Sequence, residues 1–218
     1  MQYLSLLIAS LGFLLIHFVS ATNLREMVIK KWGQNVWMML FSILSLVFFV
    51  WMVAEYMSGG RIEDLWAVPR WWLWLNAVLM FVGLGFIVLG NMPDKEARLG
   101  KGIFAITRHP TNWGVALFAF AHMISNPNVE AQLFWGSILG TGVIGSYLLD
   151  RRKLKTGGKR WVDAGENSSW VPFWAMIKGR TTLVAEDFKL LPVVVAVTVF
   201  FVAMIIHVAF FGTYILPL

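Results

Sequence analysis

The fold is decided by an apolar run over residues 36–57, VWMMLFSILSLVFFVWMVAEYM, which contains a single charged side chain, Glu55. Crossing the hydrocarbon core of a bilayer, roughly 30 Å thick, takes about 20 helical residues. A run of this length and composition is predicted to be a membrane-spanning helix. Four other runs of similar character and one shorter run accompany it along the chain.

The composition of the whole chain agrees with a membrane protein. Apolar types make up 58% of the 218 residues and charged types 14%, whereas soluble domains carry about 25% charged residues. So few charges cannot cover a solvated surface. This excludes a disordered chain and a nucleic-acid-binding protein with a basic face, and it makes the lipid bilayer the expected partner. The chain has no cysteine, so disulfides and thiolate metal sites are excluded.

We predict an all-α polytopic protein with six spans. They are residues 3–20, 36–57, 71–91, 111–125, 131–149 and 190–215. The fourth is short, but Pro110 suits the first turn of a helix, where its missing N–H costs nothing, and Asn126-Pro127-Asn128 is a turn signal at its far end. The first span lacks a basic leader and a small-residue cleavage site, so we interpret it as a retained helix.

The distribution of basic residues predicts the orientation of the spans. Connections 21–35, 92–110 and 150–189 carry 16 of the 18 Lys and Arg residues, and connection 58–70 carries the other two. Because basic loops stay in the cytoplasm, both termini are expected on the non-cytoplasmic side. We expect one domain, residues 1–218, in a bacterial cytoplasmic (inner) membrane, with a basic cytoplasmic segment at 150–189.

Histidines are the titratable residues of greatest interest in these apolar runs. His17, His122 and His207 lie within predicted spans, and His109 lies at the cytoplasmic mouth of the fourth. A neutral imidazole is a common metal ligand. The alternative interpretation is that each histidine only donates a hydrogen bond to a carbonyl group on a neighbouring helix. For a single histidine the two interpretations are about equally favoured.

A set of short motifs resembles the NnrU-domain membrane proteins, and the resemblance runs through most of the chain. The motifs are Thr107-Arg108-His109-Pro110 with Trp113-Gly114, Ala121-His122 with Asn126, His17-Phe18 followed by Leu24-Arg25, and Asp150-Arg151-Arg152-Lys153. The resemblance implies a role in denitrification, the reduction of nitrogen oxides, alongside a redox partner or respiratory membrane complex. The same superfamily holds the plant 15-cis-zeta-carotene isomerase, a haem-b enzyme. That relationship implies, as an alternative, a haem-dependent cis–trans isomerase of a lipid-soluble polyene.

The resemblance also implies a haem b site. By position, the proposed axial histidines of the isomerase fall on His17 and His122. Arg25, Arg108 and His109 are further cofactor-binding candidates, the arginines as partners of the haem propionates. Helix rise counted from the two arginines puts the axial pair about 9 Å apart in depth. Depth alone pairs His17 with His109 and His122 with His207. Two nitrogens on opposite faces of one metal ion lie about 4 Å apart.

The Arg-His-Pro turn is also similar to that of the isoprenylcysteine carboxyl methyltransferases, where it helps to hold S-adenosylmethionine. Residues 157–173 keep Trp161, Ser168, Ser169 and Val171-Pro172-Phe173. They lack the paired acidic residues and the later Arg-x-x-Pro element expected of a methyltransferase, so methyl transfer ranks below the haem functions. A last alternative is an accessory subunit without chemistry, whose histidines hold helices together.

Overall fold

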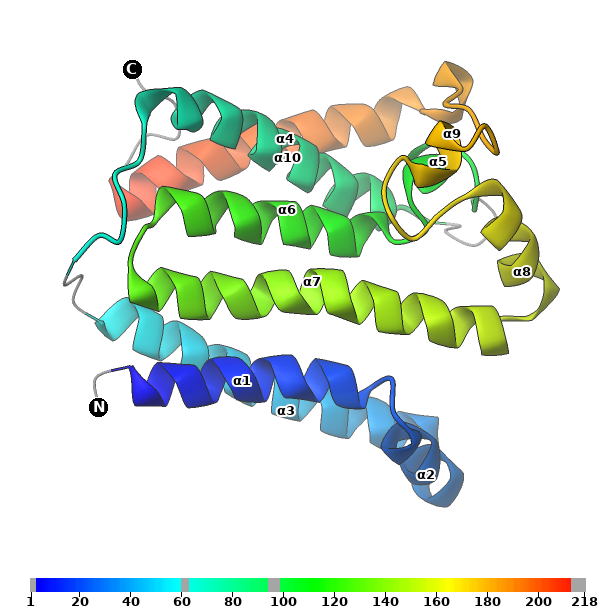
Figure 1. Cartoon of the computed structure of the whole chain (residues 1–218), viewed down its shortest axis with the longest axis horizontal. Helices are drawn as coiled ribbons and strands as arrows, with labels where there is room; N and C mark the ends of the chain where they lie inside the picture. The colour runs from blue at the N-terminus through cyan, green and yellow to red at the C-terminus, as the bar shows by residue number, and fades with distance from the viewer. Residues whose placement is uncertain (1–2, 60–62, 94–98, 213–218) are drawn as a thin grey trace.

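The computed structural model describes residues 3–59, 63–93 and 99–212. Within these ranges every regular element is helical (Figure 1), which confirms the predicted all-α class. The six longest elements are α1 (Leu4–Val19), α3 (Gln34–Ser58), α4 (Arg70–Gly90), α6 (Pro110–Ser125), α7 (Val129–Thr156) and α10 (Leu190–Phe211). The shorter elements are α2 (Asn23–Trp32), α5 (Ile103–Ile106), α8 (Gly158–Asn167), α9 (Trp174–Ile177) and the 3-10 turn η2 (Ala185–Asp187).

The long helices form a bundle in which α7 has neighbours on two sides. Helix α1 packs against α3 and α7, helix α6 packs against α4 and α7, and helix α10 packs against α4. Figure 1 shows α6, α7 and α1 in that order across the bundle. Helix α7 therefore lies between α1 and α6.

The directions of these three helices follow from their contacts. Helices α1 and α7 run parallel, because Ala9 and Phe134 belong to one buried cluster and, further along both helices, Leu14 lies against Gly140. Helix α6 runs antiparallel to α7, to which the short connection 126–128 joins it. A residue near the end of α1 and a residue near the end of α6 thus lie towards opposite ends of the bundle.

Glycines allow α6 to pack tightly between its neighbours. A Cβ atom on Gly114 would overlap the carbonyl oxygen of Gly83 on α4, and one on Gly142 of α7 would lie 2.8 Å from the carbonyl oxygen of Asn112. Real Cβ atoms do not come this close to another atom, so the three helices meet at backbone contact. Small residues permit this approach between helices in a membrane.

The outer faces of the bundle are apolar, as in Leu46 of α3, Val78 of α4 and Ile205 of α10, all exposed. Among the described helices α3, α4, α7 and α10 are long and apolar enough to cross a membrane. Helices α1 and α2 meet at an angle of 69°, and they add a fifth crossing if together they form one bent span. The chain is an integral membrane protein. Helix α6 has only 16 residues, about 24 Å, so six crossings and their orientation stay predictions.

Helix α7 extends beyond the apolar run on which it was predicted. It continues past Leu149 to Thr156, so Asp150 and Lys153 lie on a helix rather than in a connection. The polar residues that follow fold back onto the same end of the bundle. Figure 1 shows α2, α5, α8 and α9 gathered at this end, which the charge distribution predicts to be cytoplasmic.

Candidate functional site

The stretch from Thr107 to Pro110 leads the chain from α5 into α6. Thr107 is extended, with φ −155° and ψ 148°, and His109 has φ −125°, since the residue before a proline is kept out of helical conformation. Pro110 then occupies the first turn of α6. Thr107, Arg108 and His109 are buried. A buried guanidinium and a buried imidazole require partners.

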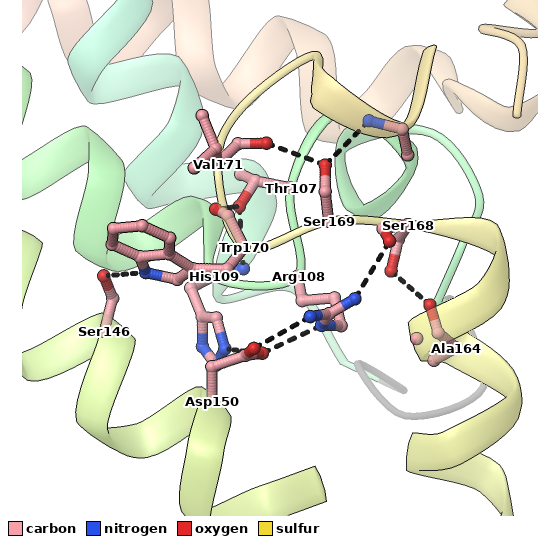
Figure 2. A network of polar contacts seen from close by, with 12 residues as sticks. Thr107, Arg108, His109, Ser146, Asp150, Ala164, Ser168, Ser169, Trp170 and Val171 are labelled. Carbon is pink, nitrogen blue, oxygen red and sulfur yellow. Dashed lines mark hydrogen bonds and ion pairs between the residues drawn. The ribbon is translucent and has the colours of Figure 1, made fainter. Parts of the chain in front are cut away.

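Asp150 of α7 supplies these partners (Figure 2). Its carboxylate accepts hydrogen bonds from Nε and Nη2 of Arg108, each at 2.8 Å, and from Nε2 of His109, also at 2.8 Å. Nη1 of Arg108 donates to the carbonyl oxygen of Ser168 at 2.9 Å. A bidentate arginine–carboxylate pair is a strong and directional contact. Because a carboxylate only accepts, Nε2 of His109 carries a proton in this arrangement.

A second set of contacts holds residues 168–170 against the same loop. The hydroxyl of Thr107 donates to the carbonyl oxygen of Trp170 at 2.7 Å, and the backbone N–H of Arg108 donates to the carbonyl oxygen of Ser169 at 3.0 Å. The indole N–H of Trp170 donates to Oγ of Ser146 on α7 at 2.8 Å (Figure 2). The segment after α8 is therefore fastened to both α7 and the start of α6.

A cavity of about 310 Å³ opens beside this network. Its wall includes Arg108, His109 and Pro110, together with Lys153 from α7 and Trp161 from α8. The rings of His109 and Trp161 are stacked, with centroids 5.8 Å apart and planes inclined by 26°. The other lining residues are Gly90, Asn91, Leu99, Phe104, Thr111, Asn112 and Leu149. The cavity thus combines apolar walls with one cationic, hydrogen-bonding side.

Residues 5–214 match the family described as NnrU protein. The chain belongs to the NnrU family. This NnrU chain is 24% identical over 197 residues to the chloroplastic 15-cis-zeta-carotene isomerase of Arabidopsis thaliana, which covers 85% of this chain and 53% of the relative. For the isomerase of Zea mays the identity is 26% over 197 residues, with 84% and 53% covered.

The NnrU chain spans about half the length of these curated relatives. No solved structure matches it significantly. Neither of the two relatives is a methyltransferase, so the likeness to methyltransferases stays a prediction. The family and the relationship to carotene isomerases are the parts of the expected resemblance that these matches confirm.

In this NnrU chain the two predicted haem ligands make similar local contacts on different helices. Nδ1 of His17 on α1 is 2.7 Å from the carbonyl oxygen of Phe13, and Nδ1 of His122 on α6 is 2.9 Å from that of Phe118. The ring of His122 also stacks on Trp135 of α7, with centroids 4.2 Å apart. Each imidazole is therefore hydrogen-bonded within its own helix, not across to a neighbour.

His17 and His122 lie beside different positions along the length of α7. Leu14 lies against Gly140, so His17, three residues further on, is level with about residue 143, whereas His122 is level with Trp135. Eight residues of helix are about 12 Å long, and two nitrogens on one metal ion are about 4 Å apart. With α7 between them, the pair does not fit the two faces of one haem.

The other predicted cofactor-binding residues are also dispersed. Arg25 lies on α2, where its Nη2 donates to Oε1 of Gln34 at 3.3 Å on the exposed surface, and Arg108 is engaged with Asp150. Of the five predicted residues, only the chain neighbours Arg108 and His109 meet at one site. No group of three or more His, Asp or Glu side chains in the described ranges is placed to hold a metal ion. Haem binding stays a prediction.

Sequence reasoning missed Asp150 as a residue of this site. The sequence contains a signal for this residue, because Asp150 ends an apolar run and is the one acidic residue of an otherwise basic stretch, residues 150–160. A carboxylate at the end of a spanning helix needs a cation or a donor from another element. The Arg108-His109 motif offered both, but nothing in the sequence fixed their distance from Asp150.

Proposed function

We propose that this NnrU-family chain is an isomerase-like membrane enzyme that acts on a lipid-soluble polyene. The observation that carries the proposal is the similarity to two plant 15-cis-zeta-carotene isomerases over 84–85% of the chain. A polyene dissolves in the bilayer, so it would reach the bundle laterally, along helices whose outer faces are apolar. The chain has about half the length of each relative, and we carry over the class of reaction only.

We assign the reacting double bond to the cavity beside Arg108 and His109. Leu99, Phe104 and Leu149 give this cavity apolar walls, and His109 places a polar group in them. Ligand sites commonly combine apolar walls with a few positioned polar groups. A volume of about 310 Å³ suits one segment of a long polyene, which is all that a reaction at one double bond requires.

Asp150 acts as a positioning residue for His109 in this proposal. Nε2–H of His109 donates to the Asp150 carboxylate, which fixes the orientation of the ring and leaves Nδ1 outside that contact. A cis–trans isomerisation adds and removes no atoms. The site has to hold the bond while it rotates and to stabilise the charge that develops, and fixed polar groups in an apolar site do this most effectively.

Conversion of a 15-cis polyene by the full chain in proteoliposomes tests the proposal. Chromatography would follow the ratio of cis to trans isomer, with and without added hemin. We expect the wild-type chain to convert the substrate and His109→Ala to slow conversion by about a hundredfold. Lys155→Ala changes an exposed residue of α7 outside the cavity and is expected to behave as wild type. No conversion by the wild-type chain under either condition contradicts the proposal.

The finer expectations of the resemblance remain separate proposals. They are haem b, a role in denitrification, a respiratory redox partner and a bacterial inner membrane. Denitrifying cells that lack the chain would accumulate nitric oxide if it supports nitrogen-oxide reduction. Unchanged nitric oxide levels in such cells would count against that role and leave the isomerase proposal untouched.

A further inference from the structure

We propose that the cavity also binds a phosphate group, at a subsite formed by Lys153 and Trp161. The inference goes beyond the isomerase proposal and does not depend on it. Among the described residues that line the cavity, Arg108 and Lys153 are charged and none is acidic. The lining is therefore cationic, which favours an anionic ligand over a neutral or cationic one.

The positive charge of this lining comes from Lys153. Arg108 is neutralised by Asp150, which it contacts through two hydrogen bonds. Lys153 has no carboxylate within ion-pair distance in the part of the chain that the structure describes. Its Nζ lies 5.4 Å from the ring centroid of Trp161, and the side chain is half-buried. The ammonium group therefore makes a cation–π contact with the indole but has no anion beside it, and a half-buried ammonium group loses hydration that an anion would replace.

Trp161 adds an unused hydrogen-bond donor to the same wall. The residue is 8% exposed, and its Nε1 is buried without an acceptor among the described residues. Buried donors in native proteins nearly always have a partner, so an orphaned one calls for an explanation. A ligand oxygen would satisfy it once the indole turns this N–H, which is closed off in the structure, towards the cavity. A ligand that satisfies both Lys153 and Trp161 must be anionic and must offer more than one acceptor oxygen, as a phosphate does.

Two sources of phosphate fit this end of the bundle. The nearby residues Phe173, Trp174 and Ile177 are exposed and apolar, as expected of a segment at the bilayer surface, where phospholipid headgroups lie. A phospholipid would place its phosphate at Lys153 and its chains along the apolar surface. A free phosphate or phosphate ester would enter from the aqueous side.

Native mass spectrometry of the detergent-solubilised full chain tests the proposal and separates the two sources. The probes are dioctanoyl phosphatidic acid, dioctanoylglycerol, which lacks the phosphate, and inorganic phosphate. We expect one saturable phosphatidic acid per chain and no comparable binding of dioctanoylglycerol. Competition by millimolar inorganic phosphate would identify a site for free phosphate. Absence of competition would identify a headgroup site that needs the lipid chains.

Matched variants locate the site. Lys153→Met is expected to weaken phosphatidic acid binding by about tenfold or more, and Trp161→Phe, which removes the indole N–H together with part of the ring, by about fivefold. Lys155→Met removes an equal charge from the exposed surface and is expected to leave the affinity unchanged. Lys153→Arg is expected to retain binding. If Lys153→Met fails to fold, Lys153→Arg and Trp161→Phe still test the phosphate subsite.

Three results would overturn the phosphate subsite. One is equal weakening by Lys153→Met and Lys155→Met, which would indicate general surface attraction. Another is equal binding of dioctanoylglycerol, which would indicate an apolar site. The third is absence of saturable binding of every probe, which would leave Lys153 and Trp161 with a packing role only. Because no polyene is present in these measurements, none of these results bears on the isomerase proposal.

Discussion

Arg108 and Asp150 form a bidentate ion pair that joins the start of α6 to the last turns of α7, with both side chains only 7% exposed. The two residues lie 42 positions apart in the sequence. The same carboxylate accepts from His109, and the same guanidinium donates to the carbonyl oxygen of Ser168. One acidic side chain therefore sets the position of the cavity's imidazole and of the segment that follows α8.

Asp150→Asn is expected to destabilise the protein by about 3–5 kcal/mol, because it leaves the buried guanidinium of Arg108 without a counter-charge. Denaturant or thermal unfolding in detergent would measure the loss. Asp163→Asn on the exposed face of α8 is the matched control and is expected to change stability by less than about 0.5 kcal/mol. Equal losses in the two variants would contradict the importance of the pair.

Replacing both partners distinguishes the pair's effect on stability from its effect on function. Arg108→Leu with Asp150→Leu removes both charges at once, so the double variant is expected to be more stable than either single variant. It also removes the partner that orients His109, and so it is expected to isomerise the polyene as slowly as His109→Ala. Full activity in the double variant would show that His109 needs no positioning by Asp150.

Thr107→Val tests the contact between the loop and residues 168–170. The side chain of Thr107 is fully buried, and valine keeps its shape while removing the hydroxyl that donates to Trp170. We expect a loss of about 1 kcal/mol and faster hydrogen exchange at the Arg108 amide, which donates to Ser169. Thr156→Val removes an exposed hydroxyl at the end of α7 and should leave that amide unaffected.

Gly114→Ala tests the close packing of α6 against α4. The new methyl group would overlap the carbonyl oxygen of Gly83, so the helices must separate, at a cost of about 1–3 kcal/mol. Gly85→Ala on α4 is the control, since nothing lies within 4 Å of its Cβ position. It is expected to leave stability unchanged or to raise it slightly through the better helix propensity of alanine. Unfolding in detergent would compare the two.

The positions of the long helices could be predicted from the sequence because each coincides with an apolar run. Pro110 located the start of α6, which agrees with its place in the first helical turn. The end of α7 could not be found in this way. The helix passes through Asp150 and Lys153. Asp150 contacts Arg108 and His109, which precede α6 and lie about forty positions away in the sequence, and Lys153 contacts Trp161 of the following helix α8.

Only part of the candidate site could be predicted from the sequence. Arg108 and His109 are neighbours in one motif, so their proximity was certain, but the partner that fixes them comes from another helix. The proposed pairing of His17 with His122 depended on family position, and the depth count already argued against it. The structure agrees with the depth count on this pair, because His17 is level with about residue 143 of α7 and His122 with Trp135. It does not bring His17 to His109, which contacts Asp150 further along α7.

Reporter fusions test the predicted orientation of the spans. A fusion after Lys155 should remain cytoplasmic, because residues 150–189 carry nine of the 18 basic residues. A fusion after Leu218, a position outside the described residues, should be exported. Cytoplasmic activity at Leu218 together with export at Lys155 would show that the short helix α6 does not cross. Cytoplasmic activity at both positions would show that α10 does not cross.

Hemin titration of the purified chain tests the remaining haem prediction, with absorption spectra recorded for the wild type and single histidine variants. Since His17 and His122 lie about 12 Å apart along α7, we expect them not to act as one axial pair. Any low-spin spectrum should therefore survive loss of at least one of them. His207→Ala tests whether the histidine on α10 contributes to the spectrum. A protein that takes up no hemin would show that the haem prediction is wrong. If His17→Ala and His122→Ala each abolish the same low-spin spectrum, both imidazoles bind one iron, and α1 and α6 must then approach each other past α7, with Trp135 displaced from His122.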